Sequence, residues 1–509
     1  MSDATAGKRV KFGNWLPTTK GTLGGLTGIG WGMLLGGVLV MVVCLVVGWW
    51  PLGLVCLLAG LLGNVFFIIR WGDPIAGRTF AARIWDRRMN TKRARAGTNH
   101  YVTGLLSNLP NESLSALPGM LADLEEITGT DGEGEEYVLL HHRKGSRNPL
   151  LAATFICHPD GTELLPQDRI DGQVSDFGGW IASLSRDSAI EGAVVVVDSA
   201  QESIAPLIAK IDSEVSPDAP AAAQRQLREG ARALSGTYAD VEVFASVVWN
   251  VNELADTIED AAADIAAKLP NHREKLAAAG AGGPVVATSS ELARAVRVAY
   301  RPDRARELGS DALDGVPFRM PVTQAGPDEF HDDQRRICYH DGVASMTAMM
   351  VAPPQMHITE ELMNVLFRPN GKFLRKRTAV FYRPLSQGKA FKTAKKVGVN
   401  ARRGSTTVTG ETDEFAKLRQ ELAQKTQMDL MSGAAMSAFA IEVTVTFEPT
   451  PQAIRRATTE LKAILEGAGD LTYRFIETDT AAAFHSTLPL GVLPWAYATA
   501  MQTVTDRTD

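Results

Sequence analysis

Hydrophobic residues are concentrated near the beginning of the chain, where Lys20 and Arg70 enclose 49 consecutive positions without a charged side chain. A membrane-spanning helix needs about 20 apolar residues, so this run predicts two helices, at 29–49 and 52–69. The segment 49–53 contains two tryptophans, a proline and a glycine, which favour a turn at the level of the lipid headgroups. We therefore expect a transmembrane helical hairpin.

Basic residues flank the predicted hairpin on both sides. Four precede it, and eight lie between Arg70 and Arg95. Because positive flanks stay in the cytoplasm, both termini are expected there, which makes this a two-pass protein of the cytoplasmic membrane. A cleaved signal peptide is the alternative, but it predicts a shorter apolar run without a second one. Apolar residues interleave with the basic residues of 75–95, which indicates an amphipathic juxtamembrane helix.

Small residues recur at four-residue spacing in both predicted helices. They are Gly28, Gly32 and Gly36 in the first helix, and Ala59 and Gly63 in the second. Such spacing allows the backbones of transmembrane helices to approach closely. Packing of the two helices within the hairpin is the simpler interpretation, and contact with helices of another subunit is the alternative.

After about residue 99, short β-branched runs alternate with amphipathic helices, which indicates an α+β body. The segments Ala193–Val197 and Val241–Trp249 are predicted strands, and Asn252–Leu269 is a predicted helix that Asn252 caps and Pro270 ends. A similar order recurs further on, with strands near 153, 195 and 245 matched by strands near 345, 380 and 444. We expect two related α+β lobes that arose by duplication.

These patterns divide the 509 residues into six parts. The parts are a basic tail (1–27), the transmembrane hairpin (28–70), a basic amphipathic helix (71–98), a first α+β lobe (99–301), a Pro- and Gly-rich linker (302–330) and a second α+β lobe (331–509). Hydrophobic residues make up 45% of the chain, which is enough for substantial cores. The four scattered cysteines fit a reducing compartment.

Sequence patterns of the common catalytic and metal sites are absent from the chain. There is no GxxxxGK[ST] loop for a triphosphate, no GxSxG and no HExxH. His331, Cys338 and His340 come nearest to a metal site, but their spacing fits no standard zinc module. The sequence therefore predicts a non-catalytic protein without a cofactor or a metal.

One stretch of the predicted body is strongly basic. Residues 1–95 carry a net charge of +9 (12 basic, 3 acidic), and the remainder carries −15 (40 basic, 55 acidic). Within that acidic remainder, residues 368–404 hold twelve basic residues and no acidic one: Arg368, Lys372, Arg375, Lys376, Arg377, Arg383, Lys389, Lys392, Lys395, Lys396, Arg402 and Arg403. A solvated face is the ordinary explanation. Docking of an acidic protein or anionic lipid is the second, and direct DNA contact is the third and is not favoured.

Several short segments occur in an order that resembles a family of actinobacterial conjugation proteins. The beginning, Lys11-Phe12-Gly13-Asn14-Trp15, resembles the segment that leads into the hairpin of PrgI-like proteins. The motifs Phe381-Tyr382-Arg383-Pro384-Leu385 and Leu488-Pro489-Leu490-Gly491 resemble the amino-terminal domain of the type IV secretion ATPase. Tyr137–His142 and Gly178-Gly179-Trp180 fit the same family.

The resemblance implies a structural subunit of a conjugative type IV secretion system that transfers DNA and protein. The chain ends at Asp509, where the motor domain of the ATPase would begin, so the implied role is a platform for a separate motor ATPase. Other membrane subunits, the lipid bilayer and further copies of this chain are the other implied partners. The alternative is a membrane-core component of a type VII-like actinobacterial exporter.

Overall fold

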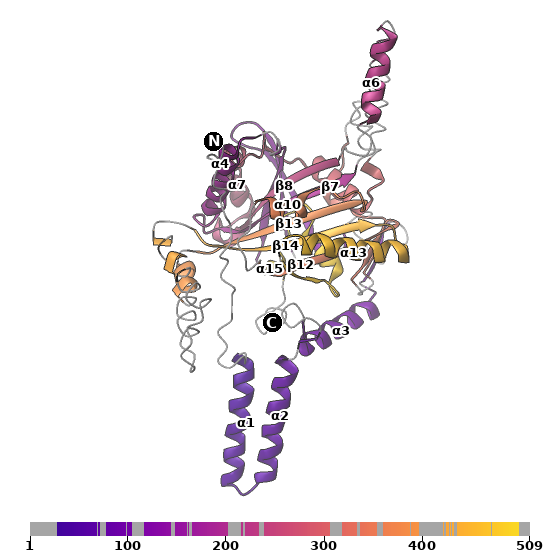
Figure 1. The fold of residues 1–509 in the computed structure, drawn as a ribbon. Coiled ribbons are helices and arrows are strands. Elements are labelled where there is room, and N and C mark those ends of the chain that lie inside the picture. Colours follow the sequence, from indigo (N-terminus) through magenta and orange to yellow (C-terminus); the bar gives the residue numbers. More distant parts are fainter. Residues whose placement is uncertain are drawn as a thin grey trace, which may run out of the picture.

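The body of the protein is built on one large sheet (Figure 1). The computed structural model describes residues 28–497 apart from gaps, of which the longest are 104–116, 202–214, 306–317 and 396–420. The sheet has 13 strands, and the pairings within it are antiparallel. The predicted α+β class is therefore confirmed.

The strands run through the body in two groups. The first group is β3 (His100–Val102), β4 (Leu124–Thr130), β5 (Glu136–His142), β6 (Leu150–Cys157), β7 (Ile190–Gln201), β8 (Ala239–Asn250) and β9 (Val285–Val286). The second group is β10 (Glu329–Asp332), β11 (Cys338–His340), β12 (Val343–Ala352), β13 (Arg375–Pro384), β14 (Ser437–Phe447) and β15 (Thr472–Phe475).

Helices cover both faces of the sheet and enclose separate cores. One face packs against α4 (Gln167–Leu184), α7 (Ile258–Ala278), α10 (Glu360–Phe367) and α13 (Pro451–Glu466). The other face packs against α8 (Ser289–Tyr300), α14 (Thr480–Ser486), α15 (Pro494–Tyr497) and the 3-10 turns η3 (Gly119–Leu121) and η5 (Val322–Gln324). The helix α6 (Ala221–Ala233) projects away from these layers (Figure 1).

The two predicted lobes share this one sheet. Strands β7 and β13 join them, with Val195 directly opposite Val380. The strand order outward from this seam is β7-β8-β6 on one side and β13-β14-β12 on the other, so the order of matched strands is the same. The described end of the predicted linker also belongs to the core, because Val322 and Ala325 are fully buried. A common origin of the two halves stays a prediction.

The long helix α7 differs from its predicted bounds at both ends. Asn252 lies in a separate 3-10 turn, and Thr257 caps the helix by accepting a hydrogen bond from the Asp260 N–H at 3.1 Å. Pro270 lies inside the helix and does not end it. The turns after Pro270 bury His272 and Leu276, and this packing outweighs the one backbone hydrogen bond that proline removes.

The two predicted apolar helices form a hairpin, α1 (Gly28–Val46) and α2 (Trp50–Ile68). The chain reverses at Gly48, whose φ of +80° suits glycine, whereas Pro51 lies within the first turn of α2. The predicted turn is therefore displaced by a few residues. In the described part of the chain, no helix is both long enough and apolar enough to be assigned as a membrane span.

A short helix joins the hairpin to the body. Strands β1 (Arg70–Trp71) and β2 (Arg78–Thr79) pair with each other, and α3 (Phe80–Arg95) follows. One side of α3 faces the body, because Asp86 and Asn90 are buried and Arg93 forms an ion pair with Asp479. Strand β3 then pairs with β10. Helix α3 thus lies against the body at the point where the chain leads from the hairpin to the sheet.

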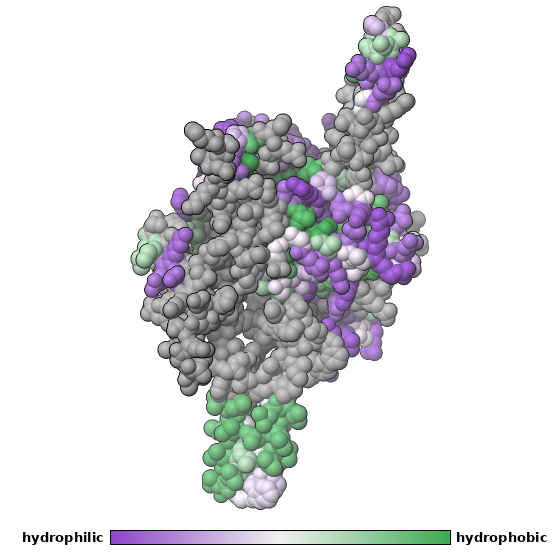
Figure 2. Space-filling model, in the orientation of Figure 1, coloured by the Kyte–Doolittle hydropathy of each residue, from purple (hydrophilic) through white to green (hydrophobic). Residues whose placement is uncertain are grey.

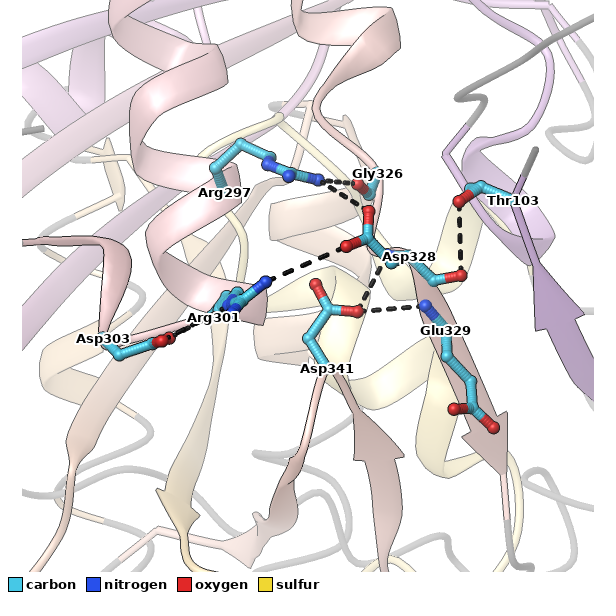
Figure 3. A network of polar contacts seen from close by, with 8 residues as sticks. All are labelled: Thr103, Arg297, Arg301, Asp303, Gly326, Asp328, Glu329 and Asp341. Atoms are coloured by element: carbon cyan, nitrogen blue, oxygen red, sulfur yellow. Dashed lines mark hydrogen bonds and ion pairs between the residues drawn. The ribbon is translucent and has the colours of Figure 1, made fainter. Parts of the chain in front are cut away.

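A polar network fixes the point where α8, β3 and β10 meet (Figure 3). The Thr103 hydroxyl donates to the Asp328 carbonyl at 3.3 Å, and the Asp341 carboxylate accepts from the Asp328 N–H at 2.8 Å. Arg297 and Arg301 of α8 lie 3.8 and 3.9 Å from the Asp328 carboxylate. These contacts hold the strand after α3 against both halves of the body.

Candidate docking surfaces

The predicted basic patch is divided between the interior and the surface. Arg375, Lys376 and Arg377 lie in β13 at the centre of the sheet and are only 1–2% exposed. These three residues cannot form part of a docking surface, so their assignment to the patch is wrong. Their strand is flanked by β7 and β14, so it has no edge that faces water.

The Arg375 side chain is paired inside the protein. Its Nε donates to the Asp198 carboxylate at 2.7 Å, and its guanidinium also reaches Glu242 at 3.4 Å. Arg294 of α8 pairs with the other oxygen of Glu242. Buried charges persist when opposite charges and hydrogen bonds compensate for lost hydration, and this cluster satisfies that condition.

The other two interior bases differ from Arg375 in their partners. Lys376 points to the opposite face, where its Nζ donates to the carbonyls of Leu366, at 2.9 Å, and Arg368. Burial lowers the pKa of Lys376 to about 8. Arg377 lies 4.5 Å over the Phe484 ring, and neither of its Nη atoms finds a hydrogen-bond partner among the described residues. Burial lowers its pKa to about 10.

A buried carboxyl lies on the same face of the sheet as the two arginines. Glu442 of β14 is 6% exposed, and the Ser486 hydroxyl donates a hydrogen bond to it. Burial raises the pKa of Glu442 to about 7, and the Ser486 hydrogen bond opposes that shift. Sequence reasoning missed this interior cluster. Its one visible signal was Asp198, an acidic residue directly after four valines in a buried strand.

The exposed members of the patch lie at the ends of β13 and beyond it. Lys372 pairs with Glu460, and Arg383 lies over the Trp495 ring and 3.7 Å from Glu191. Arg368 is exposed as well. Lys396, Arg402 and Arg403 lie outside the described residues.

Three further lysines of the patch lie on the helical segment 388–395. Lys389, Lys392 and Lys395 are exposed, whereas Ala390 and Ala394 of the same helix are buried against Leu430. The helix therefore turns its alanines inward and its lysines outward. We call these three lysines, with the half-exposed Phe391, the lysine face.

The small residues of the hairpin do not pack as their spacing predicted. Gly37 approaches the α2 backbone, and a Cβ on Gly53 would lie 2.9 Å from Cys44. Gly32 and Gly36 have open space around them, and Ala59 is exposed. The face at Gly32 and Gly36 points away from α2, which contradicts the simpler interpretation. Gly63 is half-buried, and the surroundings of Gly28 are outside the description.

The carboxy-terminal motif has a packing role. The Leu490 carbonyl lies 2.9 Å from His142 Nε2, and the Pro489 carbonyl accepts from the Thr154 hydroxyl at 3.1 Å. Gly491 has a φ of +68°, and a Cβ there would lie 2.5 Å from the Ala152 Cβ. The motif thus crosses the sheet at β5, β6 and β8, where only glycine allows so close an approach.

The weak candidate for a metal site is part of the core. Both ring nitrogens of His340 have polar neighbours, the Tyr300 carbonyl at 2.5 Å and the Ser345 hydroxyl at 2.8 Å. Cys338 is buried, and burial raises its thiol pKa. Among the residues that the structure describes, no group of His, Cys, Asp and Glu has the arrangement of a metal site.

No protein-family model matches the chain, and no curated protein is detectably similar to it in sequence.

Proposed function

We propose that the protein is a membrane-anchored, non-catalytic platform subunit of a conjugative type IV secretion system. The observation that carries the anchoring is the hairpin surface. Leu39, Val46 and Leu62 are 67%, 84% and 68% exposed, and Figure 2 shows the hairpin surface as mostly hydrophobic with a paler tip, whereas the coloured part of the body is largely hydrophilic. Apolar patches of this extent mark membrane or protein contacts. The 49 uncharged positions favour the bilayer.

The assignment to a conjugative machine rests on the order of the short motifs in the sequence. The lysine face supports a docking role, because it presents three positive charges and an aromatic ring on an otherwise acidic body. Its proposed partner is the motor ATPase, with an acidic contact surface. Electrostatic complementarity of this kind raises the association rate and weakens with salt. The outward face at Gly32 and Gly36 is available to a further copy or another membrane subunit.

Topology reporters test the anchoring. Alkaline phosphatase fused after Gly48 is expected to be active, because it would lie on the outer side of the membrane. The same enzyme fused after Gly97 is expected to be inactive, because it would lie in the cytoplasm. Activity at both points would refute two crossings. Silence at both, with the protein in the soluble fraction, would show that the hairpin is covered by a protein and not by lipid.

Charge reversal tests the docking role. Changing Lys389, Lys392 and Lys395 to Glu is expected to reduce both recovery of the ATPase on co-purification and plasmid transfer. The matched control reverses Arg455, Arg456 and Lys462, three exposed bases on α13. If the two variants behave alike, the lysine face is only a solvated surface. A salt-sensitive loss of DNA binding, without loss of the ATPase, would favour the DNA interpretation.

A further inference from the structure

The helix α3 has two polar faces with different environments. Toward the body lie Asp86 and Asn90, both buried, and at the ends of the same face Arg83 and Arg93 reach the acidic side chains of Glu477, at 3.6 Å, and Asp479. These four positions recur every three or four residues, as expected of one helix face. They fix the rotation of α3 about its axis, so the direction of its opposite face is determined.

That opposite face is exposed and strongly basic. It borders a shallow groove of about 440 Å³ whose lining comes from one side of the helix: Ile84, Arg87, Arg88, Thr91, Lys92 and Arg95. Within the described ranges, none of the four basic residues takes part in an ion pair. Four positive charges within three turns, without an ion pair to any described residue, attract anions, and the planar guanidinium groups of arginine suit phosphate oxygens.

The position of α3 identifies the anion. The helix begins twelve residues after α2 ends, and it lies between the apolar hairpin and the body, running away from the hairpin axis (Figure 1). If the hairpin is in a bilayer, α3 is at the level of the headgroups. We propose that the outward face of α3 binds the anionic phospholipid headgroups of the bilayer that holds the hairpin. This inference rests on the proposed anchoring.

Such binding would set the orientation of the body. Arg93 of α3 forms an ion pair with Asp479, and strand β3, which follows α3, is hydrogen-bonded to β10. A lipid contact on α3 would therefore fix the sheet relative to the membrane surface. Each basic residue near an anionic surface strengthens the attraction about fivefold, so three reversals would weaken it more than about a hundredfold.

The test uses the full chain in lipid nanodiscs. A polarity-sensitive fluorophore is attached at Thr91→Cys, and the same labelling without that change gives the background from the four native cysteines. The expected result is a blue shift when neutral discs are replaced by discs with roughly 30% phosphatidylglycerol. The shift should disappear in Arg87→Glu/Arg88→Glu/Lys92→Glu and at roughly 0.5 M salt, where screening is strong.

The matched control is the Arg455, Arg456 and Lys462 reversal, which changes the charge equally and should keep the shift. Co-elution of protein with the discs reports the anchoring separately. If the protein elutes with both kinds of disc but shows no response to lipid charge, the inference about α3 is overturned and the anchoring stands. If it elutes with neither, the proposed function fails. A shift induced by an acidic peptide or DNA but not by anionic discs would assign the face to another partner.

Discussion

Two parts of one basic run have opposite environments. Arg375–Arg377 lie in a central strand with almost no contact with solvent, whereas Lys389, Lys392 and Lys395 lie on an exposed helix face some ten residues later. Arg375 meets two carboxylates inside the protein, and the three lysines have none near them among the described residues. The difference shows that the local excess of basic residues does not determine their role; the position of each residue in the fold does.

The interior residues of the basic run contribute to the stability of the fold, and the exposed residues are accessible for binding. Carboxylates from β7 and β8 neutralise Arg375 because β13 pairs with β7 at the seam between the two halves of the body. Substitutions can separate the two roles, since interior changes should alter the free energy of unfolding and surface changes should not.

The largest effect is expected from Arg375→Met. The change leaves the Asp198 carboxylate, which is 1% exposed, without its strongest partner, and breaking a buried pair in this way costs about 3–5 kcal/mol. Urea unfolding of the detergent-solubilised protein measures the loss. Lys392→Met is the matched control and should cost less than about 0.5 kcal/mol. Equal losses in the two variants would abolish the distinction between the two parts of the run.

The second effect depends on pH and concerns Glu442. Its pKa is raised from 4.5 to about 7, so between these values the folded protein holds a proton that the unfolded chain releases. Stability is therefore lost as the pH rises through this window, and it stays lost above about 7. Glu442→Gln should gain about 3 kcal/mol over the wild type above pH 7 and little near pH 4.5.

Urea midpoints measured across this pH range provide the check on Glu442. Glu448→Gln, at an exposed position just after the same strand, is the control and should follow the wild type throughout. A constant difference between Glu442→Gln and the wild type at every pH would contradict burial as the cause.

A smaller effect is expected from Arg377→Met. The only described hydrogen bond of the Arg377 side chain is a long one, 3.4 Å from Nε to the Thr487 hydroxyl. Its Nη atoms have no acceptor among the described residues. Replacing a poorly satisfied buried charge with an apolar side chain of similar volume is often neutral, so the change should stay within about 1 kcal/mol. A loss as large as that of Arg375→Met would mean that the guanidinium has strong partners after all.

The smallest effect on stability is expected from the lysine face. Reversing Lys389, Lys392 and Lys395 to Glu should change the free energy of unfolding by less than about 0.5 kcal/mol for each residue, because all three are exposed. The same urea titration measures it. Marked destabilisation would show that this helix is held to the body through its lysines, and the test of docking would then lose its meaning.

Local patterns of the sequence located most of the regular elements. The strands at 193–197 and 241–249 lie within β7 and β8, and the strand expected near residue 380 lies within β13. Boundaries were less accurate where long-range packing competes with local signals. Pro270 was expected to end a helix, but burial of Leu269 and Leu276 on either side extends it to Ala278.

By itself, the sequence determined the apolar hairpin, the basic helix after it and the α+β class, because each depends on the order of neighbouring residues. Only the tertiary structure decided that two halves share one sheet, that Arg375 is interior and that Gly37, not Gly36, meets the second helix. Asp198, the partner of the buried Arg375, is 177 positions away in the chain. Chain folding brings such partners together, and no local pattern records which of them will meet.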